Sequence, residues 1–186
     1  MNERWQALGG GFLGPPPLSD KMVDWNALCE AGGETFFRDK DVLDVGPAYG
    51  LDAFMFAFYA KSYVVLDSYE VSLDHVARVA PKSKGIECNL MEKWPVADAS
   101  FDTILDFSTF DDSGAVEHCY REAARALRSQ GTLVTSYANA LQCDPAVPYT
   151  TSKPHELAAF LDSLGLKVHH RFREDGPRSV MFATKW

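Results

Sequence analysis

The stretch that decides the fold is Asp41-Val42-Leu43-Asp44-Val45-Gly46-Pro47-Ala48-Tyr49-Gly50. A short apolar strand ends in an acid and a glycine-rich turn, and an apolar segment, 51–57, follows at once as a predicted helix. A strand, turn and helix in this order presents backbone N–H groups and a helix N-terminus to a ligand at the carboxyl end of a parallel sheet. The stretch therefore predicts a site for a nucleotide-like cofactor.

This stretch resembles motif I of the class I S-adenosylmethionine (SAM)-dependent methyltransferases, in which hydrophobic residues precede (Asp/Glu)-x-Gly-x-Gly-x-Gly. Here alanine replaces the middle glycine. The extra methyl lies where the backbone approaches the methionine end of the cofactor, and we expect the glycines elsewhere in the turn to supply the unusual dihedral angles. The resemblance implies that SAM, and its product S-adenosylhomocysteine (SAH), contact the turn residues Asp44, Gly46, Pro47, Ala48, Tyr49 and Gly50.

A dinucleotide-binding turn is the main competing interpretation. It requires Gly-x-Gly-x-x-Gly, with no acid needed inside the strand. In that alignment the three glycine positions are Gly46, Ala48 and Leu51, so two of them fail. The glycine spacing and the predicted C-terminal hairpin both disfavour a nicotinamide-dependent oxidoreductase.

A second apolar strand, 63–66, is followed by Asp67, one strand-helix-strand unit beyond motif I. An acid at this position can accept hydrogen bonds from both ribose hydroxyls. The resemblance implies this role for Asp67, with Ser68 beside it. The alternative is an acidic N-cap for a helix over 71–80, and Glu70 is then the fallback ribose ligand.

A third strand, 85–88, leads into a segment, 89–102, that resembles the one in which family members carry an Asp and a Leu-Pro-Phe-like turn before the fourth strand. Asn89 stands where that Asp is usual. An Asn side-chain oxygen can accept a hydrogen bond from the adenine amino group, as a carboxylate does. The resemblance implies that contact for Asn89 and a ring-nitrogen contact for the Leu90 N–H. A turn-forming role for Asn89 is the alternative.

The fourth strand, 101–107, directs its carboxyl end toward the expected position of the transferred methyl, and the resemblance implies cofactor contacts from Asp106 and Phe107. A helix over 113–129 follows, with an apolar stripe on one face. Its arginines, Arg121, Arg125 and Arg128, lie mostly off that stripe and are interpreted as a solvated face.

The C-terminal third completes the fold. We predict a strand over 132–137, a helix over 154–164, and two strands, 166–172 and 179–185, joined by a short turn as an antiparallel hairpin. The resemblance implies an α/β, Rossmann-like fold: a mostly parallel seven-stranded sheet in the order 3-2-1-4-5-7-6, with the last strand antiparallel and helices on both faces. Residues 41–186 would form the SAM-binding methyltransferase domain.

The first 40 residues lie outside this domain. Segment 8–18 mixes glycine and proline and reads as a non-regular arm, and Ser19 or Asp20 begins a short helix through about Ala31. In many small methyltransferases such a helix covers the cofactor and helps to form the acceptor pocket. The alternative is a helix that merely covers the edge of the sheet.

Composition agrees with a single domain. The 186 residues, 46% of them hydrophobic, can bury one core. No stretch approaches the roughly 18 consecutive apolar residues of a membrane span, and an export signal is absent from the N-terminus, so we expect a cytoplasmic protein. The four cysteines show no Cys-x-x-Cys spacing, which argues against a zinc site or a disulfide framework.

The charge distribution concerns the acceptor. The formal net charge is −8, and residues 151–186 carry +2 of it, which leaves −10 on the first 150. An acidic body repels phosphates, which disfavours a nucleic-acid substrate. The (Asp/Asn)-Pro-Pro-(Tyr/Phe) motif of base-amino methyltransferases and a Pro-Cys nucleophile are both missing. We therefore expect a small-molecule acceptor.

Methyl transfer from a sulfonium is an in-line displacement that needs positioning and exclusion of water, not a metal. A general base is required only when the attacking atom keeps its proton at neutral pH. Weak candidates are Asp111, Asp112, His118 and His155, each with a plain alternative as a capping acid or an exposed helix residue. Because no catalytic residue is identifiable, a catalytically inactive SAM- or SAH-binding protein, or an interaction protein of the same fold, is the alternative function.

Overall fold

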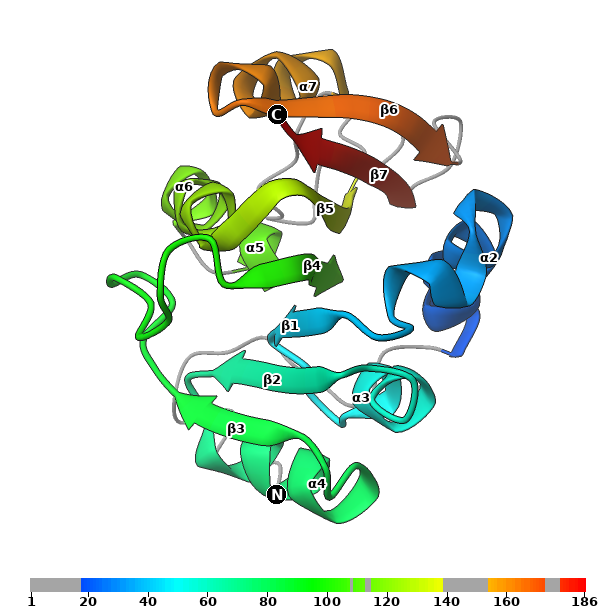
Figure 1. Cartoon of the computed structure of the whole chain (residues 1–186), viewed down its shortest axis with the longest axis vertical. Coiled ribbons are helices and arrows are strands. Elements are labelled where there is room, and N and C mark those ends of the chain that lie inside the picture. The colour runs from blue at the N-terminus through cyan, green and yellow to red at the C-terminus, as the bar shows by residue number, and fades with distance from the viewer. Residues whose placement is uncertain (1–17, 108, 113–114, 139–153, 173–177) are drawn as a thin grey trace, which may run out of the picture.

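A seven-stranded sheet forms the centre of the computed structural model, which describes residues 18–107, 109–112, 115–138, 154–172 and 178–186. The strand order is β3-β2-β1-β4-β5-β7-β6 (Figure 1). Strands β1 to β5 pair in parallel, and β7 is antiparallel to both of its neighbours, as predicted. The strand bounds are β1 Asp41–Val45, β2 Ser62–Asp67, β3 Lys84–Glu87, β4 Phe101–Phe107, β5 Leu127–Ala138, β6 Leu166–Phe172 and β7 Arg178–Lys185.

Helices cover both faces of the sheet. Figure 1 shows α2 and α3 on one side of it and α6 on the other. The predicted N-terminal helix is present as α2, but it begins at Leu18, so Ser19 and Asp20 lie within the helix instead of capping it. The helical bounds are α2 Leu18–Ala31, the 3-10 helix η1 Gly33–Phe36, α3 Leu51–Phe56, α4 Glu70–Val79, α5 Thr109–Asp112, α6 Val116–Ala126 and α7 Pro154–Ser163.

Strand β1 is central because every one of its side chains is buried and it pairs with β2 on one edge and β4 on the other. Its alternating residues face two apolar cores. Val42 packs with residues of α2 and α3, while Leu43 packs with residues of α6 and α7. A strand that is apolar on both faces is what a parallel sheet between two helical layers requires.

Helix α6 ends earlier than predicted, and β5 begins at Leu127 instead of residue 132. The Ser100 N–H donates to the Ala126 carbonyl at 2.8 Å, and Leu127 pairs with Phe101 at the start of β4. Residues after Ala126 continue the apolar pattern of a helix, but these contacts pair them with the start of β4. Gln130 then adopts a left-handed φ of 65°, a conformation that costs a glycine less than other residues.

The three arginines interpreted as a solvated helical face have different surroundings: Arg121 and Arg125 belong to α6, whereas Arg128 belongs to β5 and is 39% exposed. Arg128 lies 2.9 Å from both Asp41 and Asp102, so it connects the starts of β1, β4 and β5. Arg125 is only 18% exposed, because it contacts the backbone of Trp94 and Val96. Arg121, paired loosely with Glu117 at 3.7 Å, fits the expected solvated face.

Within the described residues, no helix combines the length and hydropathy of a bilayer-spanning segment.

Candidate cofactor site

The turn after β1 coils through three residues of positive φ. Gly46, Ala48 and Gly50 have φ angles of 69°, 49° and 70°. The Gly46 N–H donates to the Leu66 carbonyl of β2 and the Gly50 N–H to the Pro47 carbonyl, both at 2.8 Å. From the sequence we expected the glycines alone to supply the unusual dihedral angles. This expectation is wrong, because Ala48 also lies in the left-handed region. Ala48 adopts it at a cost that a glycine would avoid.

Gly46 is covered by Thr109, the first residue of α5. The Thr109 hydroxyl donates to the Gly46 carbonyl at 3.3 Å, and a Cβ built on Gly46 would overlap the threonine side chain. Sequence reasoning missed Thr109. The signal that points to it is its position just after β4, the strand paired with β1, since parallel strands bring their carboxyl ends to one edge of the sheet.

Gly50 begins α3 and faces helix α4. A Cβ on Gly50 would lie 3.0 Å from the Cγ2 atoms of Val76 and Val79. The Ser72 hydroxyl of the same helix donates to the Ala48 carbonyl at 2.8 Å. Helix α4 thus holds the turn from the side of β2.

Asp67, at the end of β2, lies against this turn. It is 5% exposed and accepts a hydrogen bond from the Tyr69 N–H at 3.0 Å. Burial raises the pKa of its carboxyl, while the nearby Ser72 hydroxyl and hydrogen bonds from backbone N–H groups, that of Ala48 among them, act in the opposite direction. The N-cap of α4 is Tyr69 and Glu70 is an exposed first-turn residue, so Asp67 is not that cap. Exposed Ser68 follows it.

The loop after β3 begins against β2, because the Cys88 N–H donates to the Asp67 carbonyl at 2.9 Å. The Asn89 Oδ1 accepts from the Met91 N–H at 3.0 Å, and its amide donates to Glu92 at 3.1 Å. Asn89 therefore forms the turn that was the alternative, and its adenine contact stays a prediction. Leu90 is buried, and its carbonyl accepts from the Trp94 indole at 3.3 Å.

Arg125 holds the rest of this loop. Its guanidinium donates to the backbone carbonyls of Trp94 at 3.1 Å and Val96 at 2.9 Å, and it pairs with Asp98 at 2.6 Å and Glu122 at 2.7 Å. Glu122 in turn accepts from the Trp94 N–H at 2.8 Å. A planar fork of donors suits such a multiple contact. Helix α6 therefore fixes the shape of the predicted adenine loop.

Asp106 at the end of β4 is fully buried. One carboxylate oxygen accepts from the N–H groups of Thr109 and Phe110, at 2.9 and 3.1 Å, and the other accepts from the Thr135 hydroxyl at 2.6 Å. The carboxylate thus caps α5 and joins it to β5, and its contact with the cofactor stays a prediction. The same holds for Phe107, which is half-buried.

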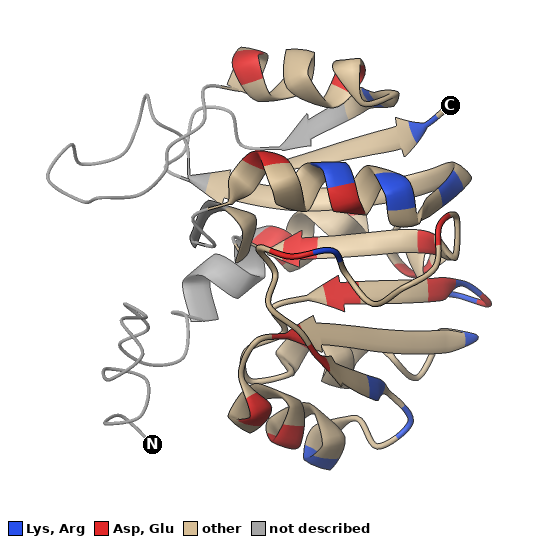
Figure 2. Cartoon of the chain, turned by 90° about the vertical axis from the view of Figure 1, so that its left-hand side faces the viewer, with Lys and Arg blue, Asp and Glu red and all other residues tan. Residues whose placement is uncertain are grey.

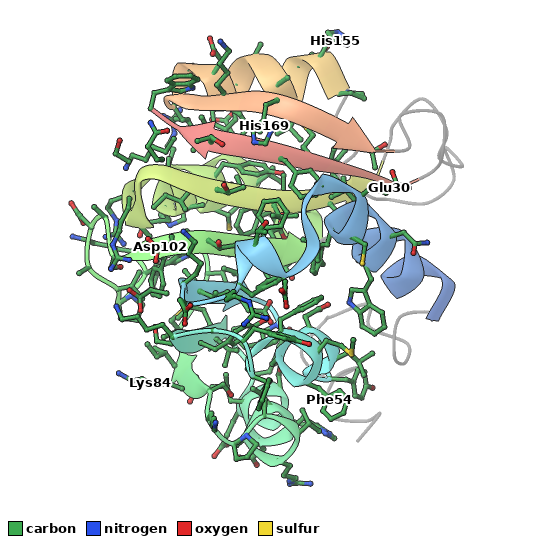
Figure 3. All side chains as sticks on the ribbon, turned by 45° about the vertical axis from the view of Figure 1, so that its right-hand side comes forward. Glu30, Phe54, Lys84, Asp102, His155 and His169 are labelled. Carbon is green, nitrogen blue, oxygen red and sulfur yellow. The ribbon has the colours of Figure 1, made fainter. Side chains whose placement is uncertain are left out.

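The candidate bases do not form one group. The side chains of Asp111 and Asp112 lie outside the described residues, although both belong to α5. The His118 Nε2 is 2.8 Å from the Glu92 carbonyl oxygen, so this ring faces the loop after β3. His155 is 73% exposed in the first turn of α7 and lies on the side of that helix away from the sheet (Figure 3).

Two further acids near the turn are buried. Asp44 is 2% exposed and accepts from the Tyr63 hydroxyl at 2.9 Å. Asp52, in the first turn of α3, is 1% exposed and accepts from the Trp25 indole of α2 at 2.9 Å. Buried carboxylates need such donors because an unpaired charge is costly away from water. Tyr63 and Asp52 were given no role from the sequence, and Trp25 was expected only on the apolar face of the N-terminal helix.

This strand order, with the antiparallel β7 and a glycine turn closing β1, defines the class I methyltransferase fold. The family model of the methyltransferase domain matches residues 43–135, and the chain belongs to this SAM-dependent family. The chain is 31% identical over 106 residues to a Mycobacterium tuberculosis protein named probable S-adenosylmethionine-dependent methyltransferase. That match covers 57% of this chain and only 38% of the relative.

Solved structures share the fold at low sequence identity. A SAM-dependent methyltransferase from Mesorhizobium loti has a TM-score of 0.77 at 15% identity, over 88% of this chain and 98% of its own. The 1,6-didemethyltoxoflavin N1-methyltransferase of Burkholderia thailandensis, bound to its acceptor and SAH, has a TM-score of 0.67 at 19% identity, over 89% and 77%. SAM is the cofactor of the family to which the chain belongs.

Proposed function

We propose that this domain transfers the methyl group of SAM to a small-molecule acceptor by in-line displacement. The observation that carries the proposal is the pairing of a buried acid with the glycine turn: Asp67 lies against the backbone of Ala48 at the carboxyl edge of the sheet. An acid at that place can accept both ribose hydroxyls while the turn approaches the rest of the cofactor.

The residues at this edge fit SAM. Asp67 would hold the ribose, and the turn would hold the methionine end, whose ammonium suits the buried carboxylate of Asp44. Asn89 and Leu90 would meet the adenine, since their loop is joined to β2 through the Cys88 N–H. When bound, SAM supplies an electrophilic methyl on a positively charged sulfur.

The other contribution of the protein is to position the acceptor relative to the methyl group. Holding the acceptor atom in line with the methyl and sulfur, with water excluded, provides most of the acceleration such a transfer needs. If the acceptor keeps a proton, Asp111 is the candidate base nearest the end of β4 in the chain. His118 is a weaker one, because its ring is engaged by Glu92.

The distribution of charge supports a small acceptor. Among the residues coloured in Figure 2, most lysines and arginines lie on the side of the molecule away from the tips of the parallel strands. The carboxyl edge instead carries buried Asp44, Asp67 and Asp106. A phosphate backbone would meet acids where the methyl is transferred. The Burkholderia thailandensis neighbour, whose name gives a small heterocycle as its substrate, provides an analogy at the level of the fold.

We also propose that residues 1–40 contribute to the acceptor pocket of the methyltransferase domain, 41–186. The part of α2 that packs on the sheet does so through Ala27 and Leu28, which are buried in the same core as Val42. Its Trp25 reaches Asp52, directly after the cofactor turn. This contact supports a position for the helix beside the proposed site of the methionine end of SAM.

The test is calorimetric titration of the full chain with SAM, SAH and NAD, with Asp67→Ala beside Asp74→Ala, an exposed acid on α4, as the matched control. We expect binding of SAM and SAH but not NAD, weakened only by Asp67→Ala. Transfer of labelled methyl is then measured with pools of small acceptors and with DNA and RNA. Binding without transfer to any acceptor would favour the inactive alternative, and transfer to nucleic acid would refute the small-molecule proposal.

A further inference from the structure

We propose that Tyr63 is a positioning residue for the cofactor: its hydroxyl holds the Asp44 carboxylate in the orientation that receives the methionine ammonium of SAM. The inference rests on the proposed function. It adds a residue of β2, outside the glycine turn and outside the ribose acid, to the machinery that selects the amino-acid end of the ligand.

The geometry of the sheet brings the two side chains together. In the parallel ladder Tyr63 is paired with Val42, and Asp44 lies two residues further along β1, on the same face. The tyrosine side chain is long enough to cross that diagonal, and its hydroxyl donates to Asp44 Oδ2 at 2.9 Å. Both residues are 2% exposed, so the contact is shielded from solvent.

The hydroxyl is a permanent donor at neutral pH. Burial, followed by the negative charges of Asp44 and Asp52, raises the pKa of Tyr63 well above its usual value. The proton therefore remains on the phenol and is directed to a carboxylate. A hydrogen bond with one charged partner is stronger than a neutral one and more directional, so it restrains the rotation of the Asp44 carboxyl group.

Packing alone does not require the hydroxyl. Tyr63 belongs to an apolar strand and contacts the core that contains Val42 and Val65, where a phenylalanine of nearly the same volume would fill the space. A polar atom in such a core is costly unless it serves a partner. Its partner here is the acid of the cofactor turn.

A second donor keeps the neighbouring acid in place. Asp52 influences the Tyr63 hydroxyl electrostatically and is itself held by the Trp25 indole at 2.9 Å. The two acids thus have separate donors, one from β2 and one from α2. Donors in a second layer that fix the orientation of a ligand-binding group are a general feature of precise sites.

The experiment compares two ligands that differ only at the relevant end. SAH carries the amino-acid group, whereas 5′-methylthioadenosine keeps the adenosine and the thioether but lacks it. For Tyr63→Phe we expect the affinity for SAH to fall at least about 10-fold, the lower end of the range for one hydrogen bond to a charged group. The affinity for 5′-methylthioadenosine should not change.

Tyr59→Phe is the matched control, because Tyr59 is 39% exposed and should alter neither affinity. Asp67→Ala should weaken both ligands equally, since both carry the ribose. Equal losses for both ligands in Tyr63→Phe, or no loss for either, would overturn the inference. If the wild-type chain binds neither ligand, the proposed function fails before the role of Tyr63 is reached.

Asp44→Asn provides a second route should Tyr63→Phe lower the thermal midpoint. The amide can still accept from Tyr63 but lacks the charge, so SAH should weaken and 5′-methylthioadenosine should not. In the double variant the loss for SAH should be smaller than the sum of the single losses, because both changes remove the same interaction. Additive losses would contradict the inference.

Discussion

Thr109 fills the space that a side chain on Gly46 would need. Its hydroxyl donates to the Gly46 carbonyl at 3.3 Å, and its side chain lies where a Cβ on Gly46 would be. Gly46 also has a φ of 69°, so the glycine is required both by its backbone conformation and by its neighbour. The end of β4 therefore fixes the shape of the turn that closes β1.

Replacing Gly46 by alanine should destabilise the fold and weaken SAM. The positive φ costs roughly 1–2 kcal/mol for any L residue, and the overlap with Thr109 adds a term of about 1–3 kcal/mol for overpacking. Urea denaturation and SAM calorimetry measure the two effects. In a Thr109→Ala background most of the overlap disappears, so the alanine should cost less there. An identical cost in both backgrounds would show that Thr109 does not constrain the turn.

The sequence was most informative where one strand determines its own surroundings. The apolar run 41–45 and its glycine turn predict a buried parallel strand, and the acid ending the next such strand has to reach the same edge of the sheet. The approach of Asp67 to the turn follows from that rule alone. The strand order itself came from resemblance to a family, not from periodicity.

The sequence was least informative where distant segments meet. Arg125 binds residues of the loop 94–98, and nothing in a helical pattern identifies partners almost 30 positions away. The early end of α6 has the same origin. Helical spacing continues past Ala126, but pairing of Leu127 with Phe101 decides the matter. Tertiary contacts override local propensity at such boundaries.

Ala48→Gly should be neutral or stabilising, although alanine-to-glycine changes usually cost stability. Ala48 has a φ of 49°, so glycine would relieve about 1–2 kcal/mol of backbone strain. The greater freedom of glycine in the unfolded chain would offset roughly 0.4–1 kcal/mol of this gain. Thermal unfolding provides the comparison, with Ala53→Gly in helix α3 as the control, which should be clearly destabilised. A loss of stability in Ala48→Gly equal to that of the control would contradict the strain.

Asp67→Asn should separate stability from binding. Burial raises the pKa of Asp67, so its ionised form opposes folding at neutral pH, and the amide should leave the ligand-free protein equally stable or more so. Loss of the charge should weaken SAM by about 1.5–3 kcal/mol, the range for hydrogen bonds to a charged group. Calorimetry and urea denaturation of the same sample test both. Unchanged SAM affinity would remove Asp67 from the site.

Arg125→Lys should loosen the adenine loop while keeping the charge. An ammonium cannot serve the carbonyls of Trp94 and Val96 together with Glu122, which the guanidinium does. We expect a loss of stability of roughly 1–3 kcal/mol from the unsatisfied buried groups. KM for SAM should rise more than kcat falls, because Asn89 and Leu90 at the start of this loop are the proposed adenine contacts. Arg121→Lys, on the exposed face, is the control. A fall in kcat at constant KM would place the effect elsewhere.

Acid should selectively remove the contribution of Asp41. The Ser62 hydroxyl, then Arg128 and Lys61, lower the pKa of this carboxyl from 3.8 to about 2. A pKa lowered in the folded state stabilises the protein above the unfolded value, and this stabilisation is lost as the pH falls from about 4 toward 2. The part that depends on pH should be on the order of 1 kcal/mol, after allowance for solvent screening. Urea denaturation of wild type and Asp41→Asn across this range should show the difference between them shrinking with acid. A difference that stays constant from pH 7 to 2 would mean that the carboxylate charge does not stabilise the junction of β1, β4 and β5.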